Sequence, residues 1–112
     1  MANDERLGEF EELILLIVWN LGESAYSVRI QEQLEEDAGR SATLGAIYAA
    51  MDRLERKRLV RSWVGRPTAV RGGRRKRFYA LTAPGRAALR RLRATRAALW
   101  GRIDSCPAGV TL

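Results

Sequence analysis

The chain has 112 residues, 46% of them hydrophobic and 29% charged, a balance that is typical of one small globular domain and not of a disordered chain. Cys106 is the only cysteine and histidine is absent, which excludes an internal disulfide framework, most zinc sites and the commonest general base. The net charge of +7 is unevenly divided, because residues 1–37 carry ten acids and two bases, whereas residues 38–112 carry three acids and eighteen bases. The basic part predicts a polyanionic partner, nucleic acid or an anionic membrane, unless it is only a solvated surface.

The first helix is expected over residues 5–21, where hydrophobic side chains recur at helical spacing until Gly22 ends the pattern. Its centre, Leu13–Trp19, is apolar on most sides but too short to cross a bilayer, which needs about 20 residues. Glu11 and Glu12 precede this run where a signal peptide would have basic residues, and the acids of this helix are expected to form a solvated face. We therefore expect a cytoplasmic protein without a membrane partner, and either another helix or a second subunit over the excess apolar surface.

The next two helices are expected close together, over about residues 25–37 and 44–57, with Ser24 and Thr43 as their N-caps. The apolar side of the second helix is formed by Val28, Ile30 and Leu34. The buried stripe of the third helix has spacings of three and four residues and consists of Leu44, Ile47, Met51 and Leu54. Two such helices joined by a short turn predict a helix-turn-helix pair.

The outer face of the third helix is small at its start and basic further on. Gly45, Ala46 and Ala49 would let the backbone approach base edges, because the major groove of B-DNA, about 12 Å wide, admits a helix. Arg53 and Arg56 would then reach phosphates on the groove wall. The alternative is that the small residues allow two helices of the protein to pack closely.

A β-hairpin is expected next, with strands over residues 59–64 and 77–81 joined by a flexible, extended tip at residues 65–76. Its four consecutive cations exceed what protects an edge strand from aggregation, and they are Arg74, Arg75, Lys76 and Arg77. On a glycine-containing tip, such side chains can follow the DNA backbone or enter a minor groove. Trp63 and Phe78 are expected to pack as core residues against the third helix.

The last helix is expected from its N-cap, Thr82, to about residue 103, with Pro84 in the first turn. Its apolar edge consists of Leu89, Leu92, Leu99 and Ile103, and its basic edge of Arg86, Arg90 and Arg93. The apolar edge and the first helix together predict a homodimer, and so an operator with inverted-repeat symmetry. Residues 105–112 show no periodicity and are expected to form a disordered tail, which leaves residues 1–104 as one domain.

Two segments carry a resemblance to a known family: LGAIYAAMDRLERKRLV at residues 44–60 and GGRRKRFYALT at residues 72–82, where the helix start T-A-P-G follows. With these motifs in this order, residues 7–92 resemble the PadR family of bacterial transcription regulators. The resemblance implies a winged helix-turn-helix domain, α+β but mostly α, with an additional C-terminal dimerisation helix. It further implies a repressor whose first and last helices build the homodimer.

The resemblance also implies site residues. Members contact DNA at the positions of Thr43, Leu44, Gly45, Tyr48 and Ala49, and they form the wing at those of Arg74, Arg75 and Lys76. The sequence stops soon after one C-terminal helix, as in the short PadR-like subgroup, whose members can hold flat aromatic molecules between subunits against a tryptophan of the last helix. Trp19 and Trp100 are the corresponding effector-binding candidates, unless both are ordinary residues of the dimer core.

The prediction is therefore a homodimeric, sequence-specific DNA-binding repressor, with a recognition helix at about residues 44–57 in the major groove and a wing at residues 65–77 on the backbone or in a minor groove. The alternative is a basic RNA-binding or ribosome-associated winged-helix domain, in which Trp63, Phe78 and Tyr79 form a stacking platform. An enzyme, a metal site or a cofactor is not expected, because the sequence has neither a paired-carboxylate motif nor a phosphate-binding loop.

Overall fold

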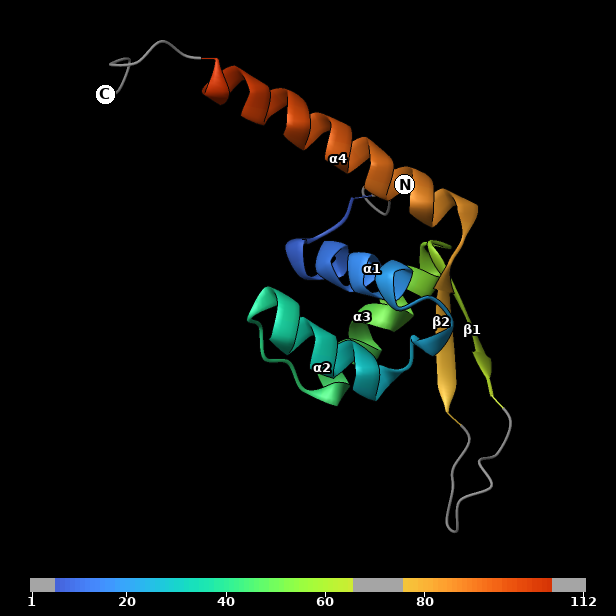
Figure 1. Cartoon of the computed structure of the whole chain (residues 1–112). Coiled ribbons are helices and arrows are strands. Elements are labelled where there is room, and N and C mark those ends of the chain that lie inside the picture. The colour runs from blue at the N-terminus through green and yellow to red at the C-terminus, as the bar shows by residue number, and fades with distance from the viewer. Residues whose placement is uncertain (1–5, 66–75, 106–112) are drawn as a thin grey trace.

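Helices dominate the structure, a computed structural model that describes residues 6–65 and 76–105 (Figure 1). In chain order its elements are α1 (Glu9–Leu21), the short 3-10 helix η2 (Gly22–Ser24), α2 (Ser27–Ala38), α3 (Leu44–Arg56), β1 (Val60–Val64), β2 (Arg77–Leu81) and α4 (Ala83–Asp104). Helix α1 lies between α4 on one side and the α2–α3 pair on the other, and the β1–β2 ribbon closes one end (Figure 1). This is the predicted winged helix-turn-helix with an additional C-terminal helix.

The first turn of α2 departs from the prediction. Ser24 is not its N-cap, because the hydroxyl of Ser24 donates to the carbonyl oxygen of Leu21 at 2.8 Å within the 3-10 turn. Residues 25 and 26 are instead drawn into the sheet: the Tyr79 N–H donates to the Ala25 carbonyl oxygen at 2.9 Å, and Tyr26 forms a bridge with Phe78. Helix α2 therefore begins only at Ser27.

The predicted caps of α3 and α4 are confirmed. The hydroxyl oxygen of Thr43 accepts from the Ala46 N–H at 3.0 Å, and that of Thr82 accepts from the Gly85 N–H at 3.1 Å. Between α2 and α3 the chain turns at Gly39, whose φ of +62° is left-handed and favours glycine. Gly39 and the Thr43 cap thus set the bounds of the helix-turn-helix pair, and the Thr82 cap sets the start of α4.

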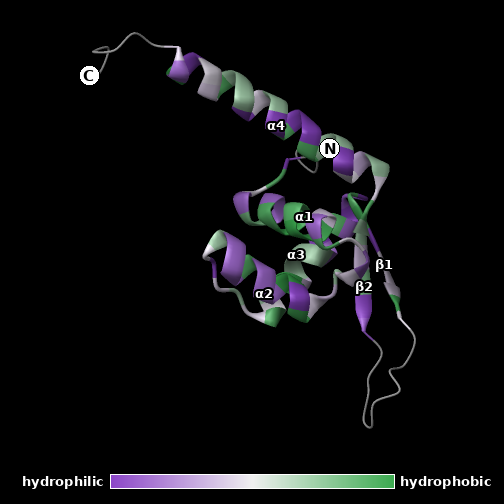
Figure 2. Ribbon diagram, viewed as in Figure 1, coloured by the Kyte–Doolittle hydropathy of each residue, from purple (hydrophilic) through white to green (hydrophobic). Residues whose placement is uncertain are grey.

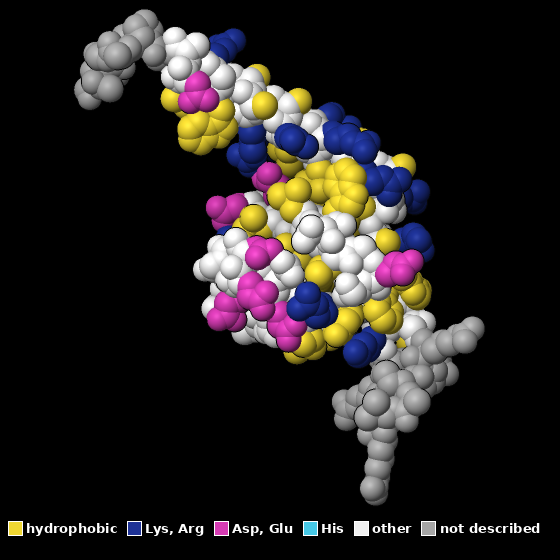
Figure 3. Space-filling view, in the orientation of Figure 1, with side chains coloured by type: hydrophobic (Ala, Val, Ile, Leu, Met, Phe, Trp, Pro, Cys, Tyr) yellow, Lys and Arg dark blue, Asp and Glu magenta, His cyan; other side chains and the backbone are white. Residues whose placement is uncertain are grey.

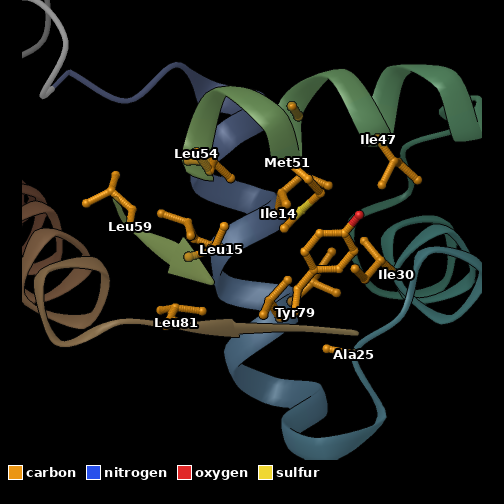
Figure 4. Packing of buried hydrophobic residues seen from close by; sticks show 14 of the residues in the cluster. Ile14, Leu15, Ala25, Ile30, Ile47, Met51, Leu54, Leu59, Tyr79 and Leu81 are labelled. Carbon is orange, nitrogen blue, oxygen red and sulfur yellow. The ribbon is translucent and has the colours of Figure 1, made fainter. Parts of the chain in front are cut away.

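The ribbon is antiparallel and pairs Val60 with Leu81 and Val64 with Arg77. On the inner face of the ribbon, Tyr79 points into the core and is only 3% exposed (Figure 4). This burial raises the pKa of the Tyr79 phenol to about 12. The prediction that Trp63 is a core residue is wrong: because side chains alternate along a strand, Trp63 and Phe78 share the opposite face. Trp63 is 38% exposed there and Phe78 is half-buried.

The core is shared by the four helices and the ribbon (Figure 4). Its largest fully buried side chains are Ile14, Leu15, Ile30, Leu34, Ile47, Met51, Leu54 and Val18. The predicted stripe of α3 is thus confirmed at Ile47, Met51 and Leu54, whereas Leu44 is half-buried, and Ala50 joins the buried set. Val28, expected on the apolar side of α2, is exposed.

Helix α4 has a packed half and a projecting half (Figures 1 and 2). Its start lies against the core through Gly85, Ala88 and Leu89. Beyond it the helix extends away from the rest of the molecule, and three large apolar side chains are more than half exposed, namely Leu99, Trp100 and Ile103. Among the described residues, no helix is long and apolar enough to span a membrane.

Candidate nucleic-acid interface

The outer face of α3 is open. Gly45, Ala46 and Ala49 are all exposed, so no helix in the described part of the chain packs on them. A Cβ built on Gly45 would meet only the Thr43 hydroxyl oxygen, at the ordinary contact distance of 3.9 Å. Packing within the chain therefore does not explain why the residues on this face are small. The interpretation that they let two helices of one chain pack closely is excluded for the described residues.

The border of this face is formed by Tyr48, a residue that is 44% exposed. Its hydroxyl lies 3.0 Å from the hydroxyl of Ser27 at the start of α2, which fixes the ring between the two helices. At the N-terminus of α3, the Thr43 hydroxyl is engaged in the cap and Leu44 is half-buried. These two residues therefore place the helix start, and Gly45, Ala46 and Ala49 follow as small, exposed residues of this face.

The two arginines of α3 have different surroundings. Arg56 follows Gly45 by about three helical turns and so lies on the same outer face, where it is exposed. It makes no hydrogen bond or ion pair with any residue in the described ranges. Arg53 was expected to reach phosphates, but its Nε donates to Glu11 Oε2 at 3.1 Å, so that the structure gives it a partner within the chain.

Glu11 is the centre of a charge cluster that was not predicted from the sequence. Glu11 is only 5% exposed, which contradicts the expectation of a solvated acidic face at this position. Burial raises the pKa of the carboxyl, but hydrogen bonds from the Gly8 N–H, Lys57 and Arg53 outweigh it, so that the pKa of Glu11 is lowered overall. Helical spacing could have located it, because Glu11 lies on the same stripe as Ile14 and Val18.

The base of the wing is tied to the body of the domain. The backbone carbonyl oxygen of Lys76 extends the ribbon by accepting the Gly65 N–H at 2.7 Å, and the side-chain Nζ of Lys76 lies 4.2 Å from the centroid of the Tyr26 ring. An Nη of Arg77 donates to the Ser62 hydroxyl at 2.9 Å, and this hydroxyl donates to Glu55 at 3.0 Å. Of the four predicted wing cations, Arg74 and Arg75 lie outside the described residues.

The aromatic residues of the ribbon do not form an open stacking platform. Tyr79 is buried, and the ring of Trp63 stacks on Phe78 with a centroid distance of 6.1 Å. Phe78 in turn meets Tyr26 edge-on at 5.7 Å, and the Arg61 guanidinium lies 4.8 Å from the Trp63 ring. The rings are thus occupied by one another and by cations, which does not favour the RNA-binding alternative.

The two effector candidates lie apart within one chain. Trp19 lines an open cavity of about 760 Å³ between α1 and α4, whereas Trp100 does not line it and is 62% exposed on the projecting part of α4. The full lining consists of Glu12, Leu16, Trp19, Leu89, Arg90, Arg93, Arg96 and Ala97. The Arg90 guanidinium lies 5.3 Å from the Trp19 ring, and Arg96 binds Glu12 through two hydrogen bonds of 2.6 and 3.0 Å.

The fold and the open face of α3 define a winged helix-turn-helix protein. Residues 14–91 match the model of the transcriptional regulator PadR-like family. The chain belongs to this family, whose members are transcriptional regulators and not enzymes, as the sequence predicted. No curated protein sequence matches the chain.

Solved structures agree with this assignment. A PadR family transcription regulator from Clostridium difficile R20291 has a TM-score of 0.70 at 26% identity, with 87% of this chain and 96% of that chain covered. A PadR-like transcription factor from Bacteroides fragilis has a TM-score of 0.69 at 25% identity, with 85% and 86% covered. Bacillus subtilis PadR in complex with operator DNA shares the fold, with a TM-score of 0.65 at 19% identity and coverage of 96% of this chain and 54% of that chain.

Proposed function

We propose that this chain is a homodimeric transcriptional repressor that places α3 in the major groove of an operator. The observation that carries the proposal is the open face of Gly45, Ala46 and Ala49, which is small although nothing in the described chain packs on it. Small side chains let a helix backbone approach base edges, and Tyr48 and Arg56 border this face with groups that can donate to bases or phosphates. The solved complex of Bacillus subtilis PadR with operator DNA supports a DNA partner for this fold.

The wing at residues 65–77 supplies affinity in this proposal, through backbone or minor-groove contacts of Arg74, Arg75, Lys76 and Arg77. Phosphate contacts release counterions and carry no direct base information. The contacts of Lys76 with Tyr26 and of Arg77 with Ser62 support a wing whose base has a defined direction relative to α3.

Dimerisation through α1 and α4, with residues 1–104 acting as one domain, is the second part of the proposal. Large apolar side chains stand exposed on both helices, at Leu16 and Trp19 of α1 and at Leu99, Trp100 and Ile103 of α4 (Figure 3). A second copy would cover them, because the projecting half of α4 has no cover within the described chain. A two-fold dimer recognises half-sites in inverted repeat, one helical turn or a multiple apart.

A flat aromatic effector is a second candidate ligand, and the cavity beside Trp19 favours it. In a dimer, Trp100 of the partner subunit could close this cavity, as the subgroup resemblance implies. The lining has three arginines and one glutamate, so its charge favours a neutral or anionic aromatic molecule over a cationic one.

The test starts with selection of bound sites from random duplex DNA by the full chain. Ala49→Leu should weaken the selected site by about tenfold or more and random DNA much less, because close approach to base edges is lost. Ala38→Leu, on an exposed alanine at the end of α2, is the matched control and should leave both affinities unchanged. Failure to select any inverted repeat, or equal losses on both DNAs, would contradict the proposal.

A further inference from the structure

Two adjacent glutamates in the first turn of α1 bind different helices. The Glu11 carboxylate accepts hydrogen bonds from Arg53 and Lys57, at and just beyond the end of α3. The Glu12 carboxylate accepts two hydrogen bonds from Arg96 of α4. Because α1 lies between α4 and α3 in Figure 1, this single turn contacts both the proposed dimerisation helix and the proposed recognition helix.

Both carboxylate oxygens of Glu11 accept hydrogen bonds from groups of the same chain. Oε1 accepts from the Gly8 N–H and from Lys57 Nζ, both at 2.9 Å, and Oε2 accepts from Arg53 Nε at 3.1 Å. Lys57 Nζ also donates to the Arg6 carbonyl oxygen at 2.6 Å, which fastens the segment before α1 to the same point. Among the described residues, Glu11 is the only charged side chain that is buried.

Such a cluster is better explained by geometry than by stability. Hydrophobic replacements of a buried ion pair are often as stable, because desolvation offsets the Coulombic gain. Directional hydrogen bonds, unlike apolar contacts, hold one helix against another at one rotation and one axial offset. Glu11 meets two residues one turn apart on α3 and therefore constrains both the position and the tilt of this helix.

The tilt of α3 has a large effect at its other end. Lys57 lies twelve residues after Gly45, so the two are separated by about 18 Å along the helix axis. A tilt of about 5° at the Glu11 end would displace Gly45 by about 1.6 Å, close to half the separation of successive base pairs. In a two-fold dimer, both recognition helices are displaced, so the change in their separation can be twice as large.

We propose that Glu11 is a positioning residue that sets the separation of the two recognition helices in the dimer, and hence the half-site spacing that the protein accepts. The inference rests on the proposed function as a DNA-binding homodimer, and it assigns a specificity role to residues that touch no DNA. Arg53 belongs to this cluster as a positioning residue for α3, with its Nε on Glu11.

The experiment varies the spacer of the selected operator by one base pair in either direction. A one-base-pair change rotates one half-site by about 35° and shifts it by about 3.4 Å, so the wild-type protein should lose about tenfold or more in affinity. Glu11→Gln keeps the size of the side chain but loses its charge, and should reduce this loss to about threefold or less. Glu32→Gln removes the same charge from an exposed ion pair with Arg29 within α2, and should keep the wild-type spacing profile.

Thermal unfolding and sedimentation establish that each variant is folded and dimeric. Should Glu11→Gln not fold, Lys57→Gln tests the same contact from the α3 side, where the ammonium group is partly exposed. An unchanged spacing profile for the folded variants would overturn the inference, as would an equal change in Glu32→Gln. Absence of any inverted-repeat binding by the wild-type protein would instead contradict the proposed function.

Arg53→Gln separates positioning from phosphate contact. A positioning role predicts a broadened spacing profile with an unchanged slope of log affinity against log salt concentration. A phosphate contact would instead lower that slope by about 0.9 per subunit on every spacer. This second result would remove Arg53 from the positioning cluster and overturn the inference for this residue.

Discussion

The two sides of α3 differ in what they contact. The inner side is buried at Ile47, Met51 and Leu54 and is fastened at its end by the ion pairs of Arg53 and Lys57 with Glu11. The outer side carries Gly45, Ala46, Ala49 and Arg56 and has no cover in the described chain. The same helix is thus fixed by one side and open on the other, an arrangement suited to presenting a rigid surface to a partner.

The difference separates two kinds of mutational effect. A change on the inner side removes contacts that exist in the free protein, so it should lower the free energy of unfolding. A change on the outer side removes nothing that the free chain uses, so it should alter binding with little effect on stability. The following four predictions test this separation.

The largest effect is expected at the centre of the inner side. Met51→Ala should lower the free energy of unfolding by about 2–5 kcal/mol, because a fully buried side chain is replaced by a cavity. Denaturant titration measures it, and Ala49→Ser on the outer side is the control, with an expected change within about 0.5 kcal/mol. Comparable losses in both variants would show that the outer side is covered in the free protein.

A smaller effect on stability is expected at Glu11, and it should depend on pH. The folded-state pKa of Glu11 is lowered below its ordinary value, so its contribution to stability is fully present above the unfolded-state pKa and is lost as the pH falls through the folded-state pKa. The difference in stability between wild type and Glu11→Gln should therefore shrink between pH 7 and pH 3. A difference that stays constant over this range would contradict the lowered pKa.

Gly45→Ala should have opposite effects on stability and on binding. Alanine is the better helix former by about 0.5–1 kcal/mol, and the added methyl group would meet only the Thr43 hydroxyl at 3.9 Å. The variant should unfold at a higher denaturant concentration and yet bind the selected operator less tightly, because in the proposed complex the new methyl group would lie between the helix backbone and the bases. Tighter or unchanged operator binding would show that Gly45 does not approach DNA.

The smallest change in stability is expected for Arg56→Ala, within about 0.5 kcal/mol, since Arg56 makes no hydrogen bond or ion pair within the described ranges. Its effect should be seen in the salt dependence of binding. Loss of one phosphate contact per subunit lowers the slope of log affinity against log salt concentration by about 0.9. Salt titrations on operator and random DNA should show this decrease on both, and an unchanged slope would place Arg56 away from phosphates.

Much of the fold could be predicted from local sequence signals. Thr43 and Thr82 are caps because a hydroxyl oxygen can accept a backbone N–H of the first turn, whatever the rest of the fold does. The return strand at residues 77–81 was predicted with the bounds that the structure has. The open face of α3 followed from helical periodicity alone.

The errors arose where distant segments meet. Ser24 has the chemistry of an N-cap, but pairing of Ala25 and Tyr26 with β2 delays the start of α2. Trp63 is apolar, yet it pairs with Phe78 of β2, on the face opposite to the buried Tyr79. Glu11 is buried because Arg53 and Lys57, more than forty residues later, bring matching charges to it.

The start of α4 shows how the absence of a side chain can direct a helix. A Cβ on Gly85 would lie 2.1 Å from the carbonyl oxygen of Leu59, an oxygen that also accepts the Thr82 N–H at 3.0 Å. Because backbone atoms cannot move aside as a flexible side chain can, any other residue at this position would push α4 away from the ribbon. The direction in which the long helix leaves the domain therefore depends on one missing methyl group. A substitution at this buried position would therefore change the direction of α4 without changing any residue that α4 exposes.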